Sequence, residues 1–353
     1  MPGGVRDAIA LGPPSALTTW AFDLLREACA VAPGRPAIRF VDRGDLIEPV
    51  GGGRGRLLYL SNYPSPSLLA ECRDGGGPLL LLLDDPFDSV RYLQQLSKGG
   101  VVEALRFQTA AVASYPQLRG RADTLLVSRV GPVTAGEIVD RILAHFGLDL
   151  SPDARGRLLR VRLGPKGEDA DLESALAACV GGHVGLDEAR RGFTDKDAAM
   201  IGGVLAPMIQ MSFSDDEAPI IWPTAAFLSG NRPDSPAELV EELTGGARIL
   251  YYGPYFHLPA GLWKARMTVG FSAGARRVPL SVEVYNGTRL LALAIMAAHQ
   301  EGIYHASFEF NLDDALQPIE IRIRSDRGAI EGRLALGKIE LIPAAASRPA
   351  AVY

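Results

Sequence analysis

The chain has 353 residues, which at roughly 100–200 residues per domain predicts two domains. Hydrophobic residues make up 47% of the sequence, and this share excludes a disordered chain. The formal charge of −5 argues against nucleic acid as a partner, because neutralising phosphates requires a basic field.

The three cysteines, Cys29, Cys72 and Cys179, are far apart and form no CxxC pair. We expect small buried thiols rather than a secreted disulfide framework. The N-terminal stretch lacks a basic leader followed by an unbroken apolar core, so no signal peptide is expected. The longest apolar run, Leu79 to Leu83, is far shorter than the about 20 residues that span a bilayer. A cytoplasmic protein without a membrane span is therefore expected.

Up to about residue 230, strands alternate with helices along the chain. The run Leu79–Leu83 has no polar face, as expected for a strand in a sheet covered on both sides. Asp85 suits the N-cap of the following helix and Pro86 its first position. The pattern predicts strands at 36–41, 56–61, 79–83 and 125–127, and helices at 19–30, 68–73 and 136–146, after 86, after 152 and from 194, with Pro207 bending or ending the last. This order predicts an α/β domain, a parallel sheet flanked by helices.

From Ala247 onward the hydrophobic period is two rather than 3.6. Trp263 lies on an apolar face that continues through alternate residues to Phe271, and we assign it to the core. Asn286-Gly287 is a strong hairpin signal. The pattern predicts an all-β antiparallel sandwich or jelly roll. The expected organisation is an α/β domain at 1–230, a linker at 231–246 and the sandwich at 247–345.

Three segments of the first domain carry a resemblance to a known family. They are Tyr59–Leu68, Leu82–Tyr92, and Ile142–Leu148 with the Ser151-Pro152-Asp153 that follows. They resemble, in order, the phosphosulfate loop of sulfotransferases, their second nucleotide motif, and a late helix with its Phe-Leu-Gly-Leu turn. The resemblance implies a sulfotransferase-like, P-loop-related fold. It also implies Ser65, Ser67 and Ser89 as the residues that would contact a nucleotide.

The chemistry of that family is not carried over. The stretch that matches the phosphosulfate loop has no basic residue, and Pro64 and Pro66 remove two N–H donors. The arginine that begins the family's second motif is Asp84 here, and a carboxylate there repels a phosphate. No histidine precedes Asp84 in the interval where the family carries its general base. We interpret the domain as a degenerate relative with no catalytic residue, unless Arg91 or Arg129 supplies the missing cation.

Other chemical signatures fail on spacing or context. Gly332–Lys338 fits a Walker A loop, but Ile339 replaces its Ser/Thr and the segment lies among predicted strands. The five histidines form no metal-ligand spacing. We therefore expect no metal site and no cofactor.

The predicted sandwich carries a second resemblance. The tract Tyr251–Trp263 is similar to the opening of carbohydrate-binding-module-like jelly rolls, which accompany bacterial glycosyltransferases and polysaccharide-assembly proteins. Sugar binding needs exposed aromatic faces and polar groups that orient hydroxyls. The candidate carbohydrate-binding residues are Tyr252, Tyr255, Phe256, His257 and Tyr285. The alternative is that several of them fill the core or an interdomain seam.

Two classes of function remain open from the sequence. The first is a non-catalytic glycan- or partner-binding protein of bacterial surface or exopolysaccharide biosynthesis, whose partners are polysaccharide or polysaccharide-assembly proteins. The second is a divergent sulfotransferase that transfers sulfate from an adenosine phosphosulfate donor to a carbohydrate. The missing cation near Ser65 and the missing histidine before Asp84 favour the first. A module that only docks another protein, or an oligomer, is compatible with the same features.

Overall fold

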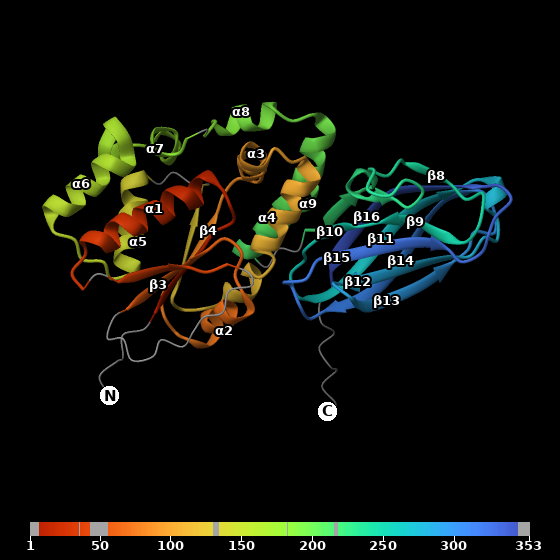
Figure 1. Cartoon of the computed structure of the whole chain (residues 1–353), viewed down its shortest axis with the longest axis horizontal. Helices are drawn as coiled ribbons and strands as arrows, with labels where there is room; N and C mark the ends of the chain where they lie inside the picture. The colour runs from red at the N-terminus through yellow and green to blue at the C-terminus, as the bar shows by residue number, and fades with distance from the viewer. Residues whose placement is uncertain are drawn as a thin grey trace. The chain divides into compact units, whose positions relative to one another are not determined.

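A computed structural model describes residues 7–34, 36–42, 56–129, 134–181, 183–214 and 218–344. Within these residues the chain forms two compact units. The first takes in residues up to 104 and from 117 to 198, and the second takes in 105–116 and the residues from 199 onward. Figure 1 labels the elements of both units.

The first unit is built on a five-stranded sheet in which every described pairing is parallel. Its strand order is β2-β3-β1-β4-β5. The strands are β1 (Ala8–Leu11), β2 (Ala37–Phe40), β3 (Leu57–Ser61), β4 (Leu79–Leu83) and β5 (Thr124–Ser128). All residues of β1, β3 and β4 are buried, as the apolar run Leu79–Leu83 predicted.

Helices flank this sheet on both faces (Figure 1). They are α1 (Ala16–Val31), α2 (Pro66–Asp74), α3 (Pro86–Ser97), α5 (Ala135–His145), α6 (Pro152–Leu163), α7 (Leu172–Cys179) and α8 (Leu186–Arg191); α4 (Val101–Val112) and α9 (Asp195–Phe213) each begin in this unit and end in the second. Asp85 caps α3 by accepting the N–H of Phe87 at 2.9 Å, and Pro86 opens the helix, as predicted. Of the two alternatives for Pro207, bending or ending its helix, the second is wrong, since α9 continues to Phe213.

The strands of the second unit form an antiparallel β-sandwich of two sheets, as the alternating pattern predicted. One sheet has the order β13-β12-β15-β9-β7, with β10 beside β15, and the other has the order β14-β11-β16-β6, with β8 beside β16. The strands are β6 (Ile220–Pro223), β7 (Leu228–Ser229), β8 (Val240–Glu242), β9 (Arg248–Tyr252), β10 (Pro254–Phe256), β11 (Gly261–Phe271), β12 (Leu280–Asn286), β13 (Arg289–Met296), β14 (Gly302–Leu312), β15 (Ile319–Ser325) and β16 (Arg333–Pro343).

Local features of the sandwich agree with the sequence pattern. Trp263 is 2% exposed and belongs to the core. Gly287 and Thr288 form the turn between β12 and β13, one residue later than the Asn286-Gly287 signal, and Gly287 has the positive φ of 58° that such a hairpin needs. The sandwich begins earlier in the chain than the predicted residue 247, because β6 and β8 already pair with β16. The segment expected to be a linker therefore contains a strand.

Candidate functional site

The carboxyl edge of the parallel sheet is where an open α/β fold binds ligands, at the point where the chain reverses direction across the sheet. Here that point lies between β1 and β4, which are neighbours in the sheet. From β1 the chain runs to β2 on one side, and from β4 it runs to β5 on the other. The residues that follow these two strands, 12–15 and 84–85, are therefore the first place to look for a site.

The N-terminus of α1 faces a carboxylate of the chain itself. Ser15 caps the helix by accepting the N–H of Thr18 at 3.1 Å. The N–H of Leu17 donates to Asp84 Oδ2 at 3.0 Å, and the Asp84 side chain is fully buried. A helix N-terminus favours negative charge and readily binds anions. At this helix Asp84 supplies that charge.

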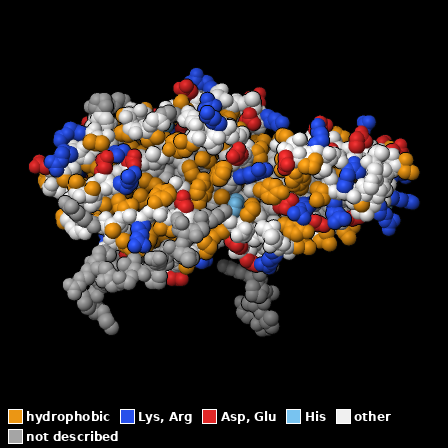
Figure 2. All heavy atoms as spheres, viewed as in Figure 1, with side chains coloured by type: hydrophobic (Ala, Val, Ile, Leu, Met, Phe, Trp, Pro, Cys, Tyr) orange, Lys and Arg blue, Asp and Glu red, His pale blue; other side chains and the backbone are white. Residues whose placement is uncertain are grey.

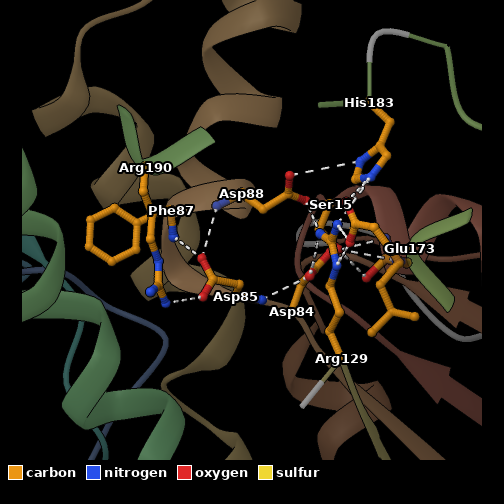
Figure 3. Close-up of polar contacts among 11 residues, drawn as sticks. Ser15, Asp84, Asp85, Phe87, Asp88, Arg129, Glu173, His183 and Arg190 are labelled. Atoms are coloured by element: carbon orange, nitrogen blue, oxygen red, sulfur yellow. Dashed lines mark hydrogen bonds and ion pairs between the residues drawn. The ribbon is translucent and has the colours of Figure 1, made fainter. Parts of the chain in front are cut away.

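A buried ion cluster holds Asp84 in place (Figure 3). Arg129, at the end of β5, has a side chain only 2% exposed. Its Nη1 lies 3.2 Å from Asp84 Oδ1 and 2.7 Å from Asp88 Oδ2. Its Nε donates to Glu173 Oε2 at 3.0 Å, and its Nη2 contacts the same carboxylate. His183 Nε2 lies 3.0 Å from both Arg129 Nη2 and Glu173 Oε1.

The cluster contains three carboxylates and one guanidinium. Burial, the charge of Asp84 and the charge of Glu173 raise the pKa of Asp88 to about 7, although Arg129 opposes the shift. Burial opposes the charged form of Arg129, but Asp84 and Asp88 outweigh it and raise the pKa of the guanidinium. Burial, followed by the charge of Arg129, lowers the pKa of His183. The imidazole therefore stays neutral at physiological pH, and Arg129 is the cluster's cation.

A second carboxylate occupies the loop in which the sequence predicted phosphate binding. Asp42, which follows β2, accepts the backbone N–H groups of Asn62 and Tyr63 at 2.9 and 3.0 Å. All three hydrogen bonds go to one oxygen, since Asp42 Oδ1 also accepts the hydroxyl of Ser61 at 3.0 Å. Two backbone N–H groups of this loop therefore already bind Asp42.

The three serines predicted to contact a nucleotide are buried or engaged in local structure. Ser65 is the N-cap of α2 and accepts the N–H of Leu68 at 3.2 Å. Ser67 hydrogen-bonds to Ser65 at 3.0 Å between the two hydroxyl oxygens. Ser89 is 1% exposed within α3. Ser65 and Ser67 follow β3, and Ser89 lies in the helix that follows β4.

Replacing Ser65 with alanine should lower the free energy of unfolding by about 1 kcal/mol, since it removes a helix N-cap. Chemical denaturation of the wild type and the variant measures this difference. Ser67→Ala, which leaves the cap in place, is the matched control and should change stability less. Equal effects would contradict the capping role.

The sequence reasoning missed the elements that form the switch point. It left out β1, and it placed the expected phosphate loop after β3 instead. The sequence signal that could have located the switch point is the Gly-Pro-Pro-Ser at residues 12–15, directly before α1. Arg129 was named as a possible phosphate ligand, but the structure shows it paired with carboxylates of its own unit.

The predicted aromatic residues of the sandwich lie in two different environments. Phe256 is fully buried, with its ring 5.8 Å from that of Trp222. His257 is 5% exposed, and its Nδ1 lies 3.0 Å from the carbonyl oxygen of Ala315. The prediction that Phe256 and His257 belong to a surface platform is therefore wrong. Both residues are buried, as the alternative interpretation of the sequence had it for some members of the set.

The other three aromatics, Tyr252, Tyr255 and Tyr285, are half-buried on one face of a sheet. Glu320 of β15 is the register partner of both Tyr285 and Pro254, so it lies between β12 and β10. Side chains of residues directly opposite each other share a face of the sheet. The rings of Tyr252 and Tyr255 lie 6.5 Å apart, edge to face.

Polar contacts connect Tyr255 and Tyr285 across three strands. The hydroxyl of Tyr255 donates to Glu320 Oε1 at 3.1 Å. Arg322 binds both oxygens of Glu320 at 2.8 Å, and its guanidinium carbon lies 4.4 Å from the centre of the Tyr285 ring. The hydroxyl of Tyr285 donates to Glu283 at 3.2 Å. We call Tyr252, Tyr255, Tyr285, Glu283, Glu320 and Arg322 the tyrosine face.

The tyrosine face is held in a defined arrangement. Burial and the neighbouring Glu320 raise the pKa of Tyr255 to about 12, so its hydroxyl remains a donor at physiological pH. Tyr255 has a φ of 66°, a left-handed conformation that is uncommon for a residue with a side chain. Such conformations cluster at ligand-binding positions.

No protein-family model and no curated protein matches the chain. Among solved structures, a mouse sulfotransferase complexed with PAP is similar at 11% identity and a TM-score of 0.38, over 59% of this chain and 88% of its own. A carbohydrate-binding module of Cellvibrio mixtus lichenase 5A in complex with cellotriose has 12% identity and a TM-score of 0.23, over 35% and 99%. A carbohydrate-binding module in complex with β-1,4-galactotriose has 10% identity and a TM-score of 0.25, over 35% and 91%.

Both folds that the sequence resembles, sulfotransferase-like and carbohydrate-binding-module-like, therefore reappear among the similar structures. These likenesses concern the fold of each unit, and what the sites can do follows from the chain's own side chains. In the part of the chain that the structure describes, no helix has the length and apolar character to cross a bilayer. Over the same residues, no three His, Cys, Asp or Glu side chains are grouped to hold a metal ion.

Proposed function

We propose that the protein is a non-catalytic glycan-binding protein, in which the sandwich binds carbohydrate through the tyrosine face. The observation that carries this proposal is a sheet face with three half-buried tyrosines. Tyr255 donates to Glu320, Arg322 lies over the Tyr285 ring, and the Tyr252 ring lies 6.5 Å from that of Tyr255. Tyrosine rings supply a large contact surface for the apolar face of a sugar, and their hydroxyls and neighbouring carboxylates orient sugar hydroxyls.

The charge pattern of the tyrosine face favours a neutral glycan. Arg322 is already bound by both oxygens of Glu320, so it offers no unpaired cation to an acidic sugar. Figure 2 shows basic and acidic side chains interspersed over the visible surface rather than gathered by sign. A hydroxyl-rich, uncharged oligosaccharide therefore fits the tyrosine face best. A role in bacterial surface or exopolysaccharide production stays a prediction, which rests on the resemblance of the tract Tyr251–Trp263.

The first unit supports a scaffold role in this proposal. A transferase would need free donors and a free cation for the phosphates of its nucleotide. At two positions on the described sheet edge, Asp42 or Asp84 already accepts backbone N–H groups. Arg129, which contacts Asp84 at the switch point, is bound by three carboxylates. These contacts favour the non-catalytic proposal over the divergent sulfotransferase.

Replacing Tyr252 or Tyr285 with alanine should weaken glycan binding at least about tenfold, which corresponds to about 1.4 kcal/mol. Each ring is half-buried at the surface, so the melting temperature should change by only a few degrees. Calorimetry against a panel of neutral glucose and galactose oligosaccharides, with retention on immobilised polysaccharides, measures the binding.

The matched control is Tyr304→Ala, which removes a half-buried tyrosine from β14 of the opposite sheet. This variant should retain wild-type affinity. The proposal fails if no neutral glycan is bound by the wild type, or if Tyr304→Ala weakens binding as much as the other two substitutions.

A further inference from the structure

The strand β13 is an edge strand with an unusual composition. It pairs with β12 on one side, and no described strand pairs with its other side. Residues 290–298, Leu-Leu-Ala-Leu-Ala-Ile-Met-Ala-Ala, contain no charged or polar side chain. Edge strands of monomeric proteins are usually protected by lysine, proline or a bulge. One register shift occurs opposite Val284 and Tyr285, but from Ala292 to Met296 the ladder is regular.

Large aliphatic side chains are exposed along this edge. Leu293 is 55% exposed and Ile295 is 72% exposed, on the outer face of the sheet. Leu290 is 47% exposed, and Ile303 at the start of the edge strand β14 is 78% exposed. We call Leu290, Leu293, Ile295 and Ile303 the apolar edge. Figure 2 shows apolar side chains along the border of the sandwich where Figure 1 places β13.

We propose that β13 pairs antiparallel with β13 of a second copy of this chain, so that two sheets join into one. A row of unpaired backbone N–H and C=O groups is satisfied by another strand rather than by a compact surface. A two-fold interface must be complementary to itself. When the run 290–296 lies antiparallel to its own copy, every apolar residue faces an apolar residue, and the single charge, Arg289, falls beyond the overlap.

Other occupants fit this edge less well. A glycan needs hydrogen-bonding side chains, and residues 290–298 have none. A membrane surface is contacted through apolar residues flanked by several basic ones. Residues 290–298 contain no lysine or arginine, and the basic residues beside them are split between the two ends, with Arg289 at one end and Arg276 and Arg277 next to residues 298–299 at the other. A second copy of β13 needs only the backbone N–H and C=O groups and the apolar side chains that the strand already presents.

The pairing of two β13 strands has a consequence for glycan binding. This consequence rests on the proposed function, whereas the pairing itself does not. Leu290 is the register partner of Tyr285, so the Tyr285 and Glu283 part of the tyrosine face lies on β12, the strand next to β13. Joining two sheets through β13 would place two tyrosine faces on one continuous sheet. A polymer with repeated sugar units could then bind both faces, and its apparent affinity would exceed that of a single face.

The test is the mass of the full chain in solution. Sedimentation equilibrium at about 10 µM should give twice the monomer mass of 37.6 kDa for the wild type. The double variant Leu293→Lys with Ile295→Lys should give the monomer mass, because lysines on an edge strand oppose pairing. Ile330→Lys is the matched control, since Ile330 is 96% exposed and lies outside β13, and it should remain dimeric.

A second measurement does not depend on the folding of a variant. Amide hydrogen exchange of wild-type residues 290–296 should slow as protein concentration rises, because pairing adds partners to the outward N–H groups of β13. A wild type that stays monomeric up to about 100 µM overturns the proposal. So does a lysine double variant that stays dimeric, an Ile330→Lys control that dissociates, or exchange in 290–296 that is independent of concentration. Glycan binding by a monomer would leave the proposed function standing while this inference fails.

Discussion

Replacing Arg129 with alanine should lower the free energy of unfolding by about 3–5 kcal/mol, because removing one partner of a buried ion pair leaves charge buried without compensation. Arg129 is 2% exposed and contacts Asp84, Asp88 and Glu173. Without it, the buried carboxyl groups of Asp84 and Asp88 lose their guanidinium partner, whereas Glu173, whose side chain is 39% exposed, remains in contact with water. Urea denaturation of the wild type and the variant measures the loss.

Arg155→Ala is the matched control for this prediction. Arg155 also binds two carboxylates, Asp140 at 2.8 Å and Glu168 at 2.6 Å, but all three side chains are at least one-third exposed. Exposed ion pairs contribute about 0–1 kcal/mol, so the control should lose little. A loss below about 1 kcal/mol for Arg129→Ala would contradict the assignment of Arg129 as the cation that stabilises the switch point.

The second large effect is a pH dependence of stability that originates at Asp88. The pKa of this carboxyl is raised from 3.8 to about 7 by burial, by Asp84 and by Glu173, against the attraction of Arg129. The folded chain therefore keeps a proton that the unfolded chain has lost, and folding becomes less favourable as the pH rises from about 4 to 7. The stabilisation from this proton is fully present below about pH 4 and lost as pH rises through about 7, with a size of about 4 kcal/mol.

Asp88→Asn, which cannot titrate, should remove this part of the pH dependence. The difference in unfolding free energy between wild type and variant should shift progressively between pH 4 and pH 7 and become constant above pH 8. Asp140→Asn, at an exposed carboxylate, should retain the wild-type slope. Parallel curves for the wild type and Asp88→Asn would show that Asp88 stays ionised across this range.

Elements fixed by local sequence could be predicted. The strand at Leu79–Leu83 follows from five consecutive apolar residues, and the start of α3 follows from the chemistry of Asp85 and Pro86. The hairpin between β12 and β13 follows from Asn286-Gly287, because only a few residue types accept the required backbone angles. In each case the signal lies within a few residues of the structure it specifies.

Features that depend on distant partners could not be predicted. The strand β1 has only four residues, and the sequence on either side of it consists of glycine, proline and charged residues. Its central position in the sheet depends on pairing with β3 and β4. The carboxylates of Asp42 and Asp84 accept N–H groups 20 and 67 residues away. Phe256 was expected on the aromatic platform with its neighbours in the tract, but it is buried. A register shift between Pro254 and Phe256, which the sequence does not reveal, interrupts the alternation of faces.

The most direct test of the account is calorimetric titration of the full chain with adenosine 3′,5′-bisphosphate, the nucleotide product that sulfotransferases share. Because Asp84 occupies the N-terminus of α1 and Arg129 is bound by carboxylates, we expect no binding at nucleotide concentrations up to about 1 mM. Binding in the micromolar range, lost in Arg129→Met under conditions where that variant is folded, would show that the switch point is an open nucleotide site and would contradict the non-catalytic account.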